Sequence, residues 1–213
     1  MNVTVILEVL PFALASAVSP LLFTIALLVA SQKKASTLKS LLFILGSGLA
    51  ITIIGFLIFF VLSEVSPGST YTNTDARIDL LIGLVLVVFA LHKFFVSKPK
   101  KAKAKKTLND FEALSLGFGF MLVNASTIIM FVPAAHVASY YAYTVKLTLL
   151  AIMVVFSLIP AIAPPMLLWI IRSPRKVTAI KNFINRNGRY IIAAVFGLIG
   201  IFEIIKAMQF FLK

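Results

Sequence analysis

Small polar residues and a proline interrupt two long apolar stretches of the sequence, and they are the first candidates for a binding site. A proline removes a backbone donor and frees the carbonyl one turn earlier. In lipid these groups need partners, so such breaks belong where protein or a water-filled cavity lines them. Paired breaks at the bilayer midplane are typical of transporter sites. The predicted substrate-binding residues are Ser16, Ser19, Pro20, Asn124, Ser126 and Thr127.

A structural interpretation of the same breaks stays open, in which they are packing kinks and Asn124 only bonds a neighbouring helix.

Three further prolines, Pro160, Pro164 and Pro165, lie close together in a later apolar stretch. Their density predicts a kinked or partly unwound segment, because each proline removes a helical hydrogen bond. This segment is a candidate gate, and a static kink near the inner interface is the alternative.

Ionisable residues are scarce within the apolar stretches. Glu203 costs about 2.5–3.5 kcal/mol at mid-bilayer on insertion scales, and less near an interface. Lys206 follows three residues later, so the two share a helix face and can pair. Glu8 enters from the same side, at the start of the first apolar stretch. Glu203, Glu8 and Lys206 are therefore candidates for proton or cation coupling, with a snorkelling structural pair as the alternative.

The residue types needed for enzymatic chemistry are not arranged for it. The two histidines, His92 and His136, fall on opposite sides of the membrane in the topology derived below, so they cannot share one site. No cluster of His, Asp and Glu has metal-ligand spacing, and no nucleotide-binding glycine motif is present. The chain has no cysteine, which excludes disulfides and thiolate metal sites within it. We expect no enzyme activity, no metal and no cofactor.

Composition predicts that helices spanning a membrane position these residues. The chain has 213 residues, of which 61% are hydrophobic and only 13% charged. In soluble domains about a quarter of the residues are charged. Crossing the hydrocarbon layer takes about 20 apolar residues in a helix. The sequence therefore predicts an all-α integral membrane protein with six transmembrane helices, at residues 5–31, 38–63, 78–97, 113–136, 147–171 and 189–211.

The positive charge of the chain indicates its orientation. Sixteen of the 20 Lys and Arg residues fall between Lys33 and Lys39, between Lys93 and Lys106, and between Arg172 and Arg189. Cytoplasmic loops carry such an excess, so both termini are predicted outside the cytoplasm and the protein in the cell (plasma) membrane. The net charge of +13 is then a topology signal, and without a recognisable binding module it does not indicate nucleic acid. The other four cations are Arg77, Lys146, Lys206 and Lys213.

The two halves of the chain look like copies. Gly83-Leu84 and Gly197-Leu198 occupy corresponding places in the third and sixth predicted spans. Copies with three spans each must insert in opposite orientations, which is the inverted-repeat design of many secondary transporters. The predicted division is a first repeat at 1–97, a basic cytoplasmic connector at 98–112 and a second repeat at 113–213.

Four short motifs are distinctive. They are the run at 13–22, Asn124 early in the fourth span, Pro160-x3-Pro164-Pro165, and Asn185-Arg186-Asn187-Gly188 before the last span. Together they resemble the GAP family, the Sap-like lipid-addressing proteins. That family is placed with the LysE superfamily of exporters, which is similar in build to the CcdA/DsbD electron carriers. The resemblance implies two inverted three-helix repeats and export of a small or amphiphilic solute, including lipids.

The chain departs from these relatives at two points. LysE-type exporters usually show Asn-Pro-Lys where this chain has Asn124-Ala125-Ser126, and CcdA-type carriers require thiols that are absent here. The leading hypothesis is an exporter that works by alternating access, with membrane lipids and a small-molecule or lipid cargo as partners and homo-oligomerisation left open. The competing hypothesis is a non-transporting scaffold or accessory protein in lipid or envelope assembly.

Overall fold

A computed structural model gives the fold of residues 3–32, 36–63, 72–95, 108–171 and 174–212, which are the residues that the structure describes. Within these ranges the chain forms helices and no strand. The helices are α1 (Val3–Ser16), α2 (Pro20–Ala30), α3 (Ser36–Ser63), α4 (Asn73–Phe95), α5 (Asp110–Leu122), α6 (Ala125–Ser139), α7 (Tyr143–Ile170) and α8 (Pro174–Phe211).

Four to six of the predicted spans are confirmed. α3, α4, α7 and the part of α8 from 186 to 211 are each long and apolar enough to cross a membrane. The first and fourth predicted spans are each broken into two helices. α1 meets α2 at 60°, and α5 meets α6 at 55°, so each pair is one broken span or a re-entrant loop. The breaks fall at the polar residues that the sequence singled out.

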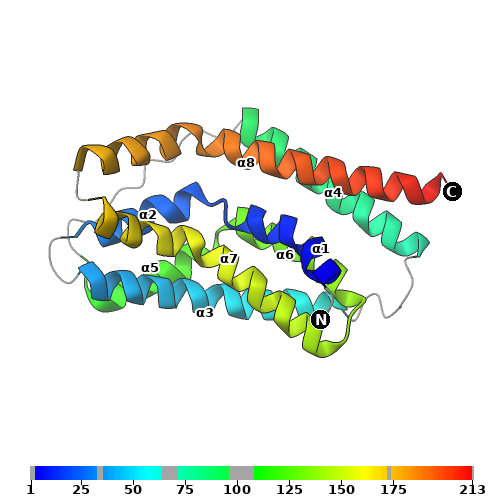
Figure 1. The fold of residues 1–213 in the computed structure, drawn as a ribbon, viewed down its shortest axis with the longest axis horizontal. Helices are drawn as coiled ribbons and strands as arrows, with labels where there is room; N and C mark the ends of the chain where they lie inside the picture. The colour runs from blue at the N-terminus through cyan, green and yellow to red at the C-terminus, as the bar shows by residue number, and fades with distance from the viewer. Residues whose placement is uncertain (1–2, 33–35, 64–71, 96–107, 172–173, 213) are drawn as a thin grey trace.

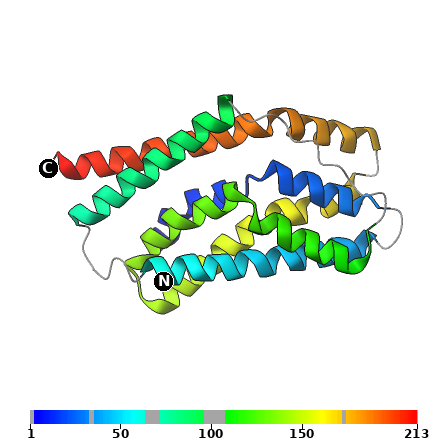
Figure 2. The same ribbon diagram turned by 180° about the vertical axis from the view of Figure 1, so that it is seen from behind.

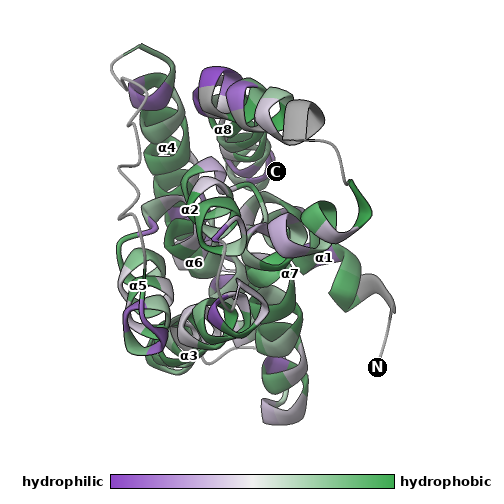
Figure 3. Cartoon of the chain, turned by 90° about the vertical axis from the view of Figure 1, so that its left-hand side faces the viewer, coloured by the Kyte–Doolittle hydropathy of each residue, from purple (hydrophilic) through white to green (hydrophobic). Residues whose placement is uncertain are grey.

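The helices are arranged in layers. α4 and α8 lie side by side as one layer, α1, α2 and α6 form the middle, and α3, α5 and α7 lie on the far side (Figures 1 and 2). Large apolar side chains such as Val61, Leu81 and Val88 are exposed on the outside of this bundle, and hydrophobic residues make up most of the helices (Figure 3). An apolar exterior of this kind is what a bilayer requires, since no water covers it.

Glycines allow the tightest contacts between layers. A Cβ on Gly83 of α4 would lie 2.7 Å from the carbonyl oxygen of Gly200 on α8, and a Cβ on Gly200 would lie 2.8 Å from that of Gly83. In α5, a Cβ on Gly117 would collide with the Phe43 carbonyl of α3. Small residues let helix backbones approach in this way in membranes. These glycines therefore serve the packing of the helices.

Two helices begin before the apolar stretch that each contains. α5 begins at Asp110, inside the predicted connector, because Asn109 and Glu112 form a capping box, a sequence signal for a helix start. α8 begins at Pro174, and proline is favoured in a first helical turn. Its membrane-spanning part at 186–211 agrees with the span predicted at 189–211. The connector residues 98–107 lie outside the described residues, as do Lys33, Lys34 and Arg172.

The helix α7 runs without interruption through Pro160, Pro164 and Pro165. The partly unwound form of this prediction was therefore wrong, and the kinked form stays a prediction. Pro160 and Pro164 are buried within the bundle. Neighbouring helices can satisfy the carbonyls that a proline frees in a membrane helix, so the helical path survives. The gating role of these prolines stays a prediction.

Candidate functional site

The two helix breaks meet through Asn124, the residue that precedes α6. Its amide oxygen Oδ1 accepts hydrogen bonds from Ser19 Oγ at 3.2 Å and from Ser126 Oγ at 2.8 Å. Its amide nitrogen Nδ2 donates to Thr127 Oγ1 at 2.7 Å. All four side chains are buried. We call these residues, together with Ser16, the polar node.

The node also satisfies the carbonyl that the first break leaves unpaired. In a continuous helix the nitrogen of residue 20 would donate to the carbonyl of residue 16, but Pro20 has no N–H. Thr127 Oγ1 donates to that Ser16 carbonyl oxygen at 3.1 Å instead. Ser157 of α7 adds a third contact, with its Oγ 2.9 Å from Ser16 Oγ. The two breaks therefore lie together, while their position at the bilayer midplane stays a prediction.

The residues of the node line neither of the two cavities described below, and the hydroxyl and amide groups of the node bond one another. Pro20 packs closely against Gly188 of α8, where a Cβ on the glycine would lie only 2.5 Å from the proline ring. The node therefore holds the broken helices in place, and its role in binding cargo stays a prediction.

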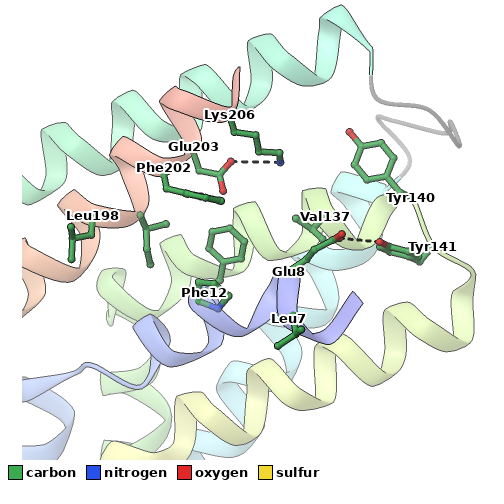
Figure 4. A pocket seen from close by; sticks show the side chains of 12 residues that line it. Leu7, Glu8, Phe12, Val137, Tyr140, Tyr141, Leu198, Phe202, Glu203 and Lys206 are labelled. Atoms are coloured by element: carbon green, nitrogen blue, oxygen red, sulfur yellow. Dashed lines mark hydrogen bonds and ion pairs between the residues drawn. The ribbon is translucent and has the colours of Figure 1, made fainter. Parts of the chain in front are cut away.

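The larger cavity lies between α1, α6 and α8 and has a volume of about 800 Å³. Apolar side chains form most of its wall, and Figure 4 shows Phe12 of α1 and Phe202 of α8 facing each other across it. Phe12 lies four residues before Ser16, which is about 6 Å along a helix. The cavity therefore ends about one turn before the polar node. Further apolar residues of the wall are Leu7, Val137, Leu198 and Ile199.

Two polar pairs border this cavity from opposite walls (Figure 4). On one wall, Tyr141 donates a hydrogen bond to Glu8 Oε2 at 2.9 Å. Tyr141 lies between α6 and α7, and burial together with the hydrogen bond and charge of Glu8 raises the pKa of its phenol. On the other wall, Lys206 Nζ lies 3.8 Å from Glu203 Oε2. The predicted pairing of Glu203 with Lys206 is observed, and all three predicted ion-coupling residues line one cavity.

Behind Lys206 lies a buried acid that sequence reasoning missed. Lys206 Nζ is 2.8 Å from Asp79 Oδ2 of α4, and His136 Nε2 of α6 is 3.2 Å from Asp79 Oδ1. The hydroxyl of Tyr140 lies 3.4 Å from the same His136 nitrogen. We call Asp79, His136, Glu203 and Lys206 the Asp79 cluster. It joins three helices that are distant in the sequence.

The importance of Asp79 follows from where its helix begins. α4 begins at Asn73 and not at residue 78, so Asp79 lies almost two turns inside a membrane helix. An ionisable residue at such a place is a functional candidate by default. His136 carried no comparable signal, because its partner comes from another helix. Among the described residues, no group of three or more His, Cys, Asp or Glu is arranged to hold a metal ion.

A second cavity, of about 510 Å³, lies between α2, α3 and α7. The hydroxyl residues Ser36, Thr37 and Ser40 line it, together with Pro165 and Trp169 of α7. Of the three prolines predicted to form a gate, Pro165 alone borders a described cavity. Trp169 is 82% exposed, and aromatic residues of this kind commonly lie at membrane interfaces.

These features define a helical, multi-pass membrane protein with an amphipathic cavity beside a buried ionic cluster. A family model described as "Sap, sulfolipid-1-addressing protein" matches residues 9–209. The chain therefore belongs to this family, and it is a lipid-related membrane protein. The resemblance to Sap-like proteins is confirmed, whereas the wider placement in the LysE superfamily stays a prediction. No curated protein and no solved structure matches the chain.

Proposed function

We propose that the protein exports an amphiphile, a lipid or lipid-like molecule, and that the cavity between α1, α6 and α8 binds it. The observation that carries the proposal is the amphipathic lining of this cavity. Phe12, Leu198 and Phe202 offer an apolar wall, while Lys206 and the Glu8–Tyr141 pair offer polar groups. An amphiphile has the matching division between tail and headgroup.

The size of the cavity is consistent with this proposal. Ligand-binding cavities commonly enclose about 300–1,000 Å³ and have mainly apolar walls with few polar groups, and this one has about 800 Å³. The family is named for a sulfolipid-addressing protein, which supports a lipid as the class of cargo. The predicted orientation, with both termini outside the cytoplasm of a plasma-membrane protein, would place this cavity toward the outer leaflet.

We further propose that the two halves of the chain are inverted repeats that alternate access to the cavity. Each half begins with a broken helix pair, bent by 60° in the first half and by 55° in the second. The hydrogen bond from Ser19 to Asn124 joins the two breaks. Transporters with inverted repeats use broken helices at the centre of the membrane in this way. No ATP-binding motif is present in the sequence, so an ion gradient or a partner would supply the energy.

The alternative is an accessory protein that binds lipid or partners without moving cargo. The observation that favours it is the closed polar node, whose side chains bond one another. A rigid centre would oppose alternation between two states. The two proposals differ in one measurable property, which is the movement of lipid between leaflets.

Reconstitution into vesicles tests the proposal. The purified protein is incorporated with a headgroup-labelled fluorescent phospholipid, and an impermeant reductant reports the rate at which the label crosses the bilayer. We expect wild-type protein to speed crossing. Leu7→Trp with Leu198→Trp fills the cavity and should slow crossing about tenfold, which corresponds to about 1.4 kcal/mol of lost binding. Val88→Trp, on an exposed face of α4 away from the cavity, is the matched control.

The outcomes separate the two functions. Cavity-filled protein that moves lipid as fast as wild type would contradict the proposed site. Wild-type protein that binds the labelled lipid but does not speed its crossing would favour the accessory role. Melting of each variant is measured on the same preparation, so that a loss of folding is not taken for a loss of transport.

A further inference from the structure

We propose that His136 binds a proton when the cavity takes an amphiphile with an anionic headgroup, because His136 then replaces Lys206 as the cation paired with Asp79. This inference rests on the proposed function, since it assumes that the cavity holds an amphiphile. It adds the charge of the headgroup, the coupling ion and the residues that exchange partners.

Lys206 is placed to serve two partners. Its side chain is 37% exposed and lines the cavity, while its Nζ lies 2.8 Å from the buried Oδ2 of Asp79. The Asp79 side chain is only 2% exposed, and it is absent from the cavity wall. Lys206 is thus the cation of the Asp79 cluster that reaches both the cavity and the buried acid. An anionic headgroup would attract it away from Asp79.

Drawing Lys206 away from Asp79 is costly at such a buried place. Breaking a buried ion pair by removing one partner is strongly destabilising, because the remaining charge is uncompensated. His136 Nε2 already lies 3.2 Å from the other carboxylate oxygen, Oδ1. If Nε2 carries the hydrogen and donates a hydrogen bond to Asp79, a further proton can bind at Nδ1. The imidazole then becomes a cation without breaking its contact with Asp79. The proton comes from water, and the histidine gains one positive charge.

The charges of the cluster support this exchange. Asp79 and Glu203 both have a carboxylate oxygen within 4 Å of Lys206 Nζ, and nearby acids favour an added positive charge. Histidine is the side chain whose unperturbed charge change falls between about pH 5 and 8. Other ionisable groups on the elements around α6 include Asp75 and Arg77 of α4, Glu8 of α1, Tyr143 and Lys146 of α7, and Tyr140 and Tyr141 after α6, while Lys39 of α3 and His92 and Lys93 of α4 lie toward the opposite ends of their helices. Of these, Asp75 accepts hydrogen bonds from Thr72, and Glu8 accepts one from Tyr141.

Coupling of this kind has a measurable sign. Proton binding at His136 and anion binding at Lys206 favour each other, and the effect is reciprocal. If one proton is taken up with each ligand, affinity rises by up to about tenfold per unit of falling pH. A zwitterionic amphiphile, which brings no net charge to Lys206, should show no such dependence. The proposal therefore predicts a difference between two ligands of equal tail length.

The experiment uses the whole protein in detergent with two short-chain lipids, dihexanoyl phosphatidylglycerol and dihexanoyl phosphatidylcholine. Binding is measured by calorimetry from pH 5 to 8, and a pH-indicator dye in weak buffer reports protons taken up. We expect uptake of about one proton with the anionic lipid, none with the zwitterionic lipid, and loss of uptake in His136→Gln. His92→Gln, which changes an exposed histidine of α4, is the matched control and should keep the uptake.

Glu203→Gln identifies the group that holds the proton. It should keep the pH dependence, because Glu203 is not the proton acceptor in this scheme. Loss of the dependence in Glu203→Gln together with its retention in His136→Gln would overturn the assignment to His136. Binding of the anionic lipid without proton uptake would overturn the coupling and leave the proposed function standing. Absence of binding of either lipid at every pH would overturn both.

Discussion

Ser19 Oγ donates a hydrogen bond to Asn124 Oδ1 across 3.2 Å, and the two residues are 105 positions apart in the sequence. Each of them directly precedes a helix that begins after a break, Pro20–Ala30 in one case and Ala125–Ser139 in the other. Neither caps its own helix through its side chain. The two side chains instead link the breaks to each other, so one bond ties the first half of the chain to the second.

Replacement of Asn124 by alanine should destabilise the fold. Ser19, Ser126 and Thr127 would lose a buried partner, and such a loss costs about 1–3 kcal/mol. Unfolding of the detergent-solubilised protein, followed by circular dichroism, measures the change. The double variant with Ser19→Ala should be less than additive, because the two residues share a bond. Ser115→Ala, at an exposed serine of α5, is the control, and equal stability of Asn124→Ala and Ser115→Ala would contradict the role of the node.

Two glycines of α5, Gly117 and Gly119, should respond in opposite directions to substitution by alanine. A Cβ at Gly117 would meet the backbone carbonyl of Phe43, which cannot move aside cheaply, whereas a Cβ at Gly119 meets nothing within 4 Å. Gly117→Ala should cost about 1–3 kcal/mol by overpacking. Gly119→Ala should be neutral or stabilise by up to about 1 kcal/mol through helix propensity. The two melting temperatures are compared directly, and a tolerant Gly117 would disprove the close contact of α3 and α5.

The bond between Tyr141 and Glu8 should make stability sensitive to alkaline pH. Since the folded protein raises the pKa of Tyr141 above its usual value near 10, the folded state holds this proton more tightly. Its contribution is present at lower pH and is lost as pH rises through the raised pKa. Tyr141→Phe should therefore flatten the decline of melting temperature at high pH. Tyr143→Phe, two residues later and exposed, should leave the decline unchanged, and a wild-type decline in Tyr141→Phe would refute the prediction.

The orientation in the membrane can be tested with single cysteines, since the natural chain has none. The excess of Lys and Arg between Lys93 and Lys106 predicts that this loop lies in the cytoplasm. An impermeant thiol reagent added to intact cells should therefore label Thr72→Cys and leave Lys103→Cys unlabelled. Labelling after the cells are opened shows that both cysteines are reactive. The reverse pattern in intact cells would invert the topology and place the larger cavity on the cytoplasmic side.

Much of the fold is visible in the sequence, because a bilayer imposes simple rules. A helix that crosses lipid must satisfy its own backbone and cover itself with apolar side chains, so long apolar runs identify α3, α4, α7 and the last part of α8. Pro20 and the polar residues around Asn124 identified the two breaks for the same reason. The helix starts at Asp110 and Pro174 lie outside the apolar runs, so hydropathy alone does not mark them.

The candidate site depended on contacts that only the folded chain creates. Glu203 and Lys206 are neighbours on one helix turn, so their pairing followed from spacing alone. Asp79 and His136 approach within 3.2 Å although 57 positions separate them, and nothing local in either segment specifies the other. Their meeting is decided by the packing of α4 and α8 at Gly83 and Gly200 and by the position of α6 beneath that pair. The sequence thus determined which segments enter the membrane and where they break, since those properties are local. Tertiary structure decided which buried charges face one another, because that depends on how distant helices pack.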